Sequence, residues 1–192
     1  EPLLAARARV DSPDHEGQSP LMVACEYGHG GCCEALLGAG AKLNVRSSWG
    51  DTPLSLAIAN KHVEALQALL ASSGASTAVH VRSERRRTAL MNAALVQSAE
   101  LVELLLTAGA SPHAVDEDGA TALLPACEGG HVECVKLLLK HGCPPGKPNR
   151  VGRTPVMTCC FGGQADYHDP NPSPSPSPSP NPNPNPNPTP NP

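Results

Sequence analysis

Aromatic residues are nearly absent from this 192-residue chain, which has one Phe, one Trp and two Tyr, or 2% of its residues. Hydrophobic residues still make up 40% of the chain, so a core has to be built mainly from Leu, Val, Ala and Cys. Small aliphatic side chains favour close packing of helices over an aromatic-rich β-sandwich. The composition therefore predicts a helical fold.

Long apolar runs and a large excess of one charge are also missing. No stretch approaches the roughly 18 apolar residues of a membrane span, and no signal peptide opens the chain. A net charge of -4 gives no overall attraction to nucleic acid or to an anionic membrane. We expect no nucleic-acid partner, no direct membrane insertion and an intracellular location, in the cytoplasm first and the nucleus second.

Catalytic signatures are absent as well. The sequence has no glycine-rich phosphate loop, no nucleophile elbow and no His-Glu-x-x-His. Scattered Cys, His and Asp residues do not make a site unless a concave pocket holds a nucleophile, a base and an orienting group together. We therefore expect no enzymatic activity, no metal and no cofactor.

What the sequence does have is an internal repeat. GQSPLMVACEYGHGGCCEALLGAGAKLN (17–44) aligns in register with GATALLPACEGGHVECVKLLLKHGCPPG (119–146). One apolar slot recurs at intervals of 33, 36, 33 and 33 residues, at Leu21, Leu54, Leu90, Leu123 and Val156. Such a period indicates stacked units that bury their apolar faces against one another, with three extra residues at one junction.

The residues inside the period resemble the ankyrin repeat. The family's Thr-Pro-Leu opening, in which Ser or Thr caps a helix and Pro occupies its first turn, has similar segments at 19–21, 52–54 and 154–156 and weaker copies at 88–90 and 121–123. Gly-His pairs match the family's inter-helix turn at 28–29 and 130–131. Leu-Leu pairs match the second helix, and its left-handed caps are expected at Gly40, Gly74, Gly109 and Gly142.

One family feature is missing. The His that follows the opening is replaced in every unit, by Met22, Ser55, Met91, Leu124 and Met157. The hydrogen-bond network typical of the family therefore cannot form in the usual way. We expect modest stability.

The resemblance implies an all-α ankyrin-repeat solenoid of helix-turn-helix pairs with β-hairpin loops, with four full repeats and a partial repeat at each end. The repeat domain is expected at 1–165, divided into 1–13, 14–46, 47–82, 83–115, 116–148 and 149–165. Residues 166–192 are expected to form a disordered low-complexity tail, because Pro alternates with Asn, Ser or Thr from Pro170 onward. The tail is a linker, a kinase-modified segment or a glycosylated tract, and the chain is interpreted as a fragment.

Eight Cys raise the question of metal or redox chemistry. All eight fall in slots that the resemblance assigns to apolar residues, namely Ala, Val or Ile, so we interpret them as packing residues with free thiols. A zinc site needs four convergent ligands, usually with a short Cys-x2-4-Cys spacing that is missing here. The alternative is a thiol-based redox or metal sensor that uses Cys32-Cys33 or Cys159-Cys160, of which the second pair is expected to be the more exposed.

The resemblance also implies a function, which is binding of a protein partner of unknown identity by a monomeric, non-catalytic scaffold or adaptor. Its concave surface is formed by the hairpin tips and the first helices. Aromatic residues and Arg most often dominate interface energy. The slots that the fold does not require assign partner binding to Tyr27, Trp49, Asp51, Arg85, Arg87, Leu95, Glu117, Asp118, Glu128, Arg150, Arg153 and Phe161.

Other interpretations stay open. Trp49 and Phe161 are alternatively residues that shield the exposed edges of the stack. The arginines of 82–87, placed in the hairpin that carries the insertion, either meet an acidic or phosphorylated partner or are neutralised by the acidic hairpin 116–118. The whole segment is alternatively the regulatory or targeting arm of a larger enzyme, channel or ubiquitin ligase.

Overall fold

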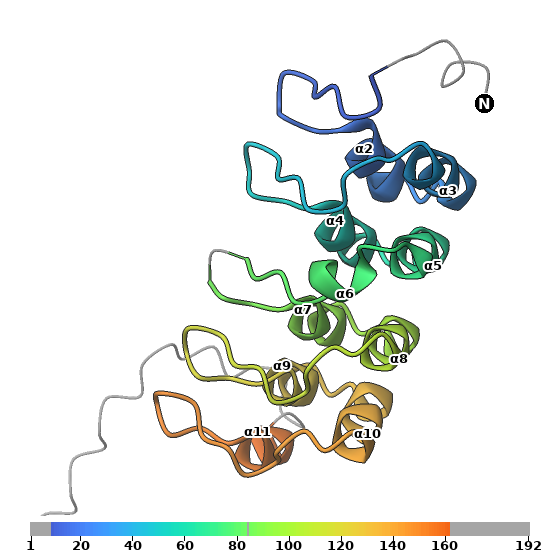
Figure 1. The fold of residues 1–192 in the computed structure, drawn as a ribbon. Helices are drawn as coiled ribbons and strands as arrows, with labels where there is room; N and C mark the ends of the chain where they lie inside the picture. Colours follow the sequence, from blue (N-terminus) through green and yellow to red (C-terminus); the bar gives the residue numbers. More distant parts are fainter. Residues whose placement is uncertain (1–8, 84, 162–192) are drawn as a thin grey trace, which may run out of the picture.

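The computed structural model describes residues 9–83 and 85–161, and in these ranges the chain forms ten helices and no strand. Five first helices form one row of the stack (Figure 1), namely α2 (Pro20–Glu26), α4 (Pro53–Ala59), α7 (Ala89–Leu95), α9 (Leu123–Glu128) and α11 (Pro155–Phe161). Four second helices form the adjacent row, namely α3 (Gly30–Gly38), α5 (Val63–Ala71), α8 (Ala99–Thr107) and α10 (Val132–Lys140). The predicted all-α solenoid is confirmed, while the predicted tail lies outside the described residues.

A side-chain cap starts most of the first helices. Ser19, Thr52 and Thr88 each accept a hydrogen bond from the backbone N–H three residues later, and Pro20 and Pro53 occupy the first turn, where no N–H is needed. The residue that replaces the missing His accepts a hydrogen bond in return. The Ser19 N–H donates to Met22 Sδ at 3.5 Å, and the Thr52 N–H donates to Ser55 Oγ at 2.8 Å. The network expected to be lost is therefore partly replaced by reciprocal capping.

Between the two helices of each pair, one residue takes a left-handed conformation. Gly28 and Gly130 have φ of 75° and 67°, and the same position holds Lys61 and Gln97, with φ of 58° and 65°. The turn is closed by a backbone bond such as that from His62 N to Ala57 O at 2.9 Å. These helices are too short to be stable alone, so packing against the neighbouring repeats has to stabilise them.

The core lies between the two rows of helices. Its largest fully buried side chains are Leu, Ile, Val and one Met, and among the described residues no aromatic side chain is buried. Each helix contacts its counterpart in the next repeat, as α2 contacts α4 and α3 contacts α5. The aliphatic core expected from the composition is confirmed.

Tight hairpins project from the stack on the side of the first helices (Figure 1). Each is closed by one bond of the same kind, from Asp14 N to Gln18 O at 3.0 Å in the first, and the same bond recurs at 47–51, 83–87, 116–120 and 149–153. Adjacent hairpins are also joined, because Glu117 N donates to Arg85 O at 3.1 Å and Arg150 N donates to Asp118 O at 2.8 Å. The tips therefore form a row of fixed order.

Two predictions about the junction between the repeats 47–82 and 83–115 are wrong. The three extra residues do not lie in the hairpin, since 83–87 closes like the other hairpins. They lengthen the segment between α5 and that hairpin, where they form the short helix α6 (Ala75–Ala78). Gly74 is not a left-handed cap, because it precedes α6 with φ of -93°, whereas Gly40, Gly109 and Gly142 have positive φ.

Candidate functional site

Large apolar side chains are exposed along the hairpins and the first helices. Trp49, at the tip of its hairpin, is 75% exposed, and Tyr27, at the end of α2, is 65% exposed. Leu95, at the end of α7, is 50% exposed. The Tyr27 ring stacks on His29, with ring centroids 6.3 Å apart. None of the three contributes to the buried core, so the fold leaves them available for contact.

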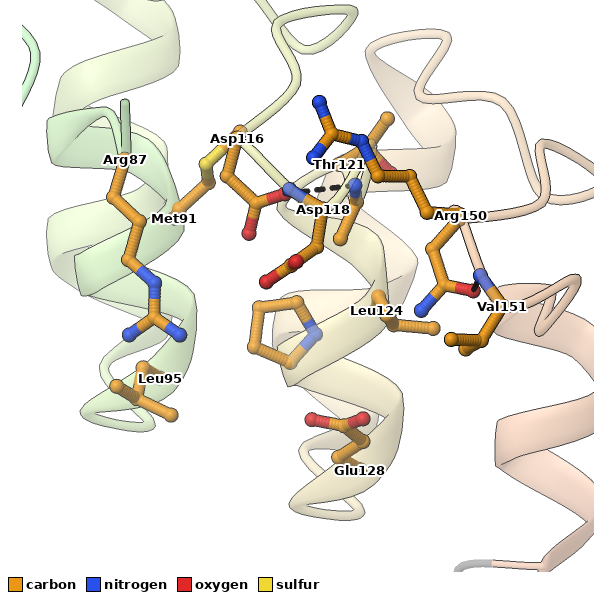
Figure 2. A pocket seen from close by; sticks show the side chains of 13 residues that line it. Arg87, Met91, Leu95, Asp116, Asp118, Thr121, Leu124, Glu128, Arg150 and Val151 are labelled. Carbon is orange, nitrogen blue, oxygen red and sulfur yellow. Dashed lines mark hydrogen bonds between the residues drawn. The ribbon is translucent and has the colours of Figure 1, made fainter. Parts of the chain in front are cut away.

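Five of the residues predicted for partner binding line one hollow of about 300 Å³. They are Arg87, Leu95, Asp118, Glu128 and Arg150. Figure 2 shows Arg87 and Leu95 on one side, Leu124 and Glu128 on α9, and Arg150 with Val151 beyond them. The hollow is at the lower limit of small-molecule sites in volume, which suits one or two side chains of a partner.

The other predicted residues lie outside this hollow. Asp51 lines a smaller hollow of about 100 Å³ between α4 and α7, which Arg87 also reaches. Its carboxylate accepts a bond from Ser55 Oγ at 3.4 Å, so Asp51 also supports the start of α4. Arg85 and Glu117 are joined through their backbones, and Arg153 lies 3.9 Å from Glu128. The side chain of Phe161 lies outside the described part of the chain.

The arginines before the hairpins have a structural task. Arg46 donates from Nη2 to Arg82 O at 2.7 Å, and Arg82 donates from Nη1 to Val115 O at 2.8 Å. These two bonds tie three consecutive repeats together. Arg82 is therefore committed to the fold, which leaves Arg85, Arg86 and Arg87 as the basic residues of the 82–87 run.

The arginines at 85–87 form no direct ion pairs with the acidic hairpin 116–118. No ion pair within 4.0 Å joins Arg85, Arg86 or Arg87 to a carboxylate of 116–118. Asp116 instead accepts the backbone N–H groups of Asp118 and Ala120 at 3.0 and 2.9 Å. The same use of an acceptor at the start of a hairpin recurs at Asp14, Ser47 and Asn149.

Sequence reasoning missed part of the hollow, including Met91, Thr121, Pro125 and Val151. A hydroxyl at Thr121 looks like the cap of the other repeats, but Thr121 Oγ1 has no hydrogen-bond partner although the residue is only 2% exposed. Pro125 lacks the N–H that elsewhere bonds to the cap carbonyl, as Leu56 N bonds to Thr52 O at 3.1 Å. Leu124 N bonds to Thr121 O instead, at 3.1 Å. The sequence did contain a signal for this altered helix start, because Pro125 stands one turn after the cap position Thr121.

The cysteines divide into two groups. Five are buried, whereas Cys32, Cys159 and Cys160 are exposed, so the interpretation of all eight as packing residues is wrong for these three. The expected exposure of Cys159-Cys160 is confirmed. Burial raises the pKa of Cys134 and Cys143, and with the neighbouring Cys159 it raises the pKa of Cys127 to about 12. Those thiols are held in the unreactive protonated form.

Cys25 and Cys33 approach each other in the core, with their sulfurs 3.7 Å apart. The pKa of Cys25 is raised, first by its hydrogen bond with Cys33, while that of Cys33 is lowered by the same bond. The adjacent pair Cys32-Cys33 is split between surface and core, because consecutive residues of a helix point about 100° apart. Within the described residues, no group of three or more His, Cys, Asp or Glu is placed to hold a metal ion.

Comparison with known proteins gives one match. A family model described as ankyrin repeats (3 copies) matches residues 1–81 and 90–168. No curated protein matches the chain. Across the described ranges, none of the helices has the length and apolar character that crossing a membrane requires.

Proposed function

The chain belongs to the ankyrin repeat family, and on that premise we propose that it binds a partner protein through the surface formed by its hairpins and first helices. Ankyrin repeats are generally protein–protein interaction modules. The observation that carries the proposal is the set of exposed apolar side chains on this surface, Tyr27, Trp49 and Leu95. Large apolar side chains at such positions are typical anchors of an interface.

The finer parts of the proposal follow from the same surface. The segment acts as a non-catalytic scaffold or adaptor, and as a monomer. Its partner is a protein and not a nucleic acid, because carboxylates interrupt the arginines along the row of hairpins and no aromatic platform lies among those arginines. We propose an intracellular location, in the cytoplasm first and the nucleus second, which the free thiols support.

A paired comparison of variants tests the binding surface. Trp49→Ser/Leu95→Ser removes two exposed apolar side chains from the proposed surface. Val132→Ser/Leu139→Ser is the matched control, because Val132 and Leu139 are 60% and 43% exposed on α10 in the second row. The full chain and both variants are used as bait in the source cell, with circular dichroism to verify their helix content.

We expect a partner that the parent and the control capture and that the Trp49/Leu95 variant loses by tenfold or more. Equal capture by all three baits refutes the proposed surface. Loss in the α10 variant alone moves the interface to the second row of helices. The alternative role, as an arm of a larger enzyme, channel or ubiquitin ligase, predicts that the captured partner is a substrate of a domain encoded in the same transcript.

A further inference from the structure

Charge alternates along three consecutive hairpins. The sequence of the hairpin 83–87 has three arginines and Glu84, a net charge of +2. The hairpin 116–120 carries three carboxylates, and 149–153 carries Arg150 and Arg153. The backbone bonds from Glu117 N to Arg85 O and from Arg150 N to Asp118 O hold the three in register. A basic, an acidic and a second basic tip therefore lie in a fixed row.

These charges remain available to a partner. The three arginines of the first tip make no ion pair with the carboxylates of the second, as described above. Glu128 lies 3.9 Å from Arg153, and both side chains are about half exposed, so the pair is weak. Asp118 is exposed, and no described side chain pairs with its carboxylate. The alternating charges of the hairpin tips are therefore not taken up by strong ion pairs within the described part of the fold.

The hollow lies beneath the acidic tip and has both apolar and polar walls. Met91, Leu95, Leu124 and Pro125 supply the apolar part, and Asp118 and Glu128 supply carboxylates (Figure 2). Thr121 belongs to the same lining, and its buried hydroxyl lacks a hydrogen-bond partner. An unpaired buried polar group is destabilising, so Thr121 marks this wall of the hollow as a place where the fold gives up stability.

A basic side chain with an aliphatic stem fits these walls. The stem of Lys or Arg packs against apolar surface while the charged head reaches a carboxylate. Here the stem contacts Leu95 and Pro125, and the head reaches Asp118 or Glu128. On either side of it, acidic side chains of the same segment face Arg87 and Arg150.

The repeat geometry sets the spacing of those charges. Packed helices lie about 8–10 Å apart. A polyproline II segment advances about 3.1 Å per residue with three residues per turn, so every third side chain lies on the same face. Successive tips are therefore about three residues apart along such a segment. Because the order acid, base, acid is symmetric, a segment running in either direction satisfies it.

We propose that the surface over α7, α9 and the hairpin 149–153 binds a partner segment in polyproline II conformation with the pattern acid-x-x-base-x-x-acid, whose basic side chain enters the hollow. The inference rests on the proposed function and names the partner chemistry of the same surface. A uniformly acidic or phosphorylated segment is disfavoured, because its centre meets Asp118 and Glu128. A uniformly basic segment meets arginines at both ends.

A peptide array tests the charge order directly. The probes are peptides of the form Z-Pro-Ala-Z-Pro-Ala-Z with Ser-Gly ends, in which each Z is Glu, Ser or Lys, giving all combinations; the prolines favour the polyproline II conformation. The full chain is applied at low ionic strength, because exposed charge contacts weaken with salt. We expect the Glu/Lys/Glu peptide to bind about tenfold better than Glu/Glu/Lys, which has the same composition and net charge.

Two variants locate the central site. Asp118→Asn/Glu128→Gln should remove the preference for Lys at the centre, while Glu at the flanks stays preferred. Glu133→Gln is the control, since Glu133 is an exposed carboxylate of α10 that pairs with Lys136 at 2.8 Å, and it should behave like the parent chain.

Absence of peptide binding, binding that ignores charge order, or an unchanged central preference in the double variant overturns the inference. Best binding by Glu/Glu/Glu also overturns it and assigns the arginines to an acidic partner. The proposed function is tested separately by capture of the partner. If capture depends on Trp49 and Leu95 while the array fails, only the charge pattern is wrong.

Discussion

Replacing the hydroxyl of Thr121 with a methyl group is expected to stabilise the stack, whereas the same change at Thr52 is expected to destabilise it. The two residues occupy equivalent positions of their repeats. Thr52 Oγ1 accepts from Ser55 N at 3.1 Å and caps α4. Thr121 is buried, and its hydroxyl makes no well-formed hydrogen bond although it lies beside the Cys143 thiol, because the entry to α9 is altered by Pro125. Thr→Val keeps the shape of the side chain and removes only the polar atom.

The magnitudes follow from the hydrogen bonds. Thr52→Val removes the acceptor of the Ser55 N–H, and the loss of such a helix cap costs about 1 kcal/mol. Removal of a buried, unpaired hydroxyl returns part of a desolvation cost of about 1–3 kcal/mol, so we expect Thr121→Val to gain about 1 kcal/mol. The two variants should then differ by about 2 kcal/mol, or roughly 4–8 °C in Tm for a chain of this size.

Urea unfolding followed by circular dichroism measures the two effects. The midpoint should rise for Thr121→Val and fall for Thr52→Val with unchanged slope. Thr107→Val, at the exposed end of α8, is the control and should shift the stability by less than about 0.5 kcal/mol. Destabilisation by Thr121→Val equal to that of Thr52→Val would show that the Thr121 hydroxyl caps α9 like the others, and the reasoning would be wrong.

Three further predictions concern backbone strain, thiol accessibility and thiol ionisation. Arg86→Gly should raise the stability by about 1 kcal/mol, since Arg86 has φ of 56° where four other hairpins have Gly; Arg85→Gly is the control, and an equal gain there would contradict the reasoning. In native protein a thiol reagent should modify Cys32, Cys159 and Cys160 first, and the five buried thiols only after unfolding, with labelling of all eight at one rate as the contrary result. Because the folded pKa values of Cys127, Cys134 and Cys143 are raised, the stability they contribute is complete below about pH 8.5 and declines as the pH rises; urea midpoints at pH 7 and 10 measure this decline, which a flat profile would refute.

Most of the fold could be predicted from the sequence, because the repeat carries its own signals. A cap residue, a first-turn Pro, a left-handed turn and paired leucines recur at fixed distances, and each acts locally. The position of the insertion was missed because the repeat period reports only the total number of residues between equivalent slots. Three extra residues shift the period wherever they lie between Leu54 and Leu90, so the spacing alone does not distinguish a longer hairpin from the observed α6.

The candidate site was harder to predict. Exposed positions of a repeat are those that the fold does not constrain, so the sequence indicated which residues are available but not which of them share a hollow. Arg87, Leu95, Asp118 and Arg150 come from three different repeats, and their proximity depends on how the repeats stack. In the sequence, Arg82 cannot be distinguished from the arginines that follow it. Its bond to Val115 O, seen only in the structure, identifies it as a structural arginine that is not available to a partner.

The irregularities of the third and fourth repeats gather around the hollow. Pro125 changes the entry to α9, Thr121 keeps an unpaired hydroxyl, and Arg86 holds a left-handed conformation in the adjacent hairpin. Each of these departs from what local stability favours, and Thr121→Val and Arg86→Gly are both expected to stabilise the chain. Residues that lower stability without a compensating contact in the free protein are concentrated at functional sites. Their position beside a row of alternating charge supports this surface, and not the α10 side, as the one that meets a partner.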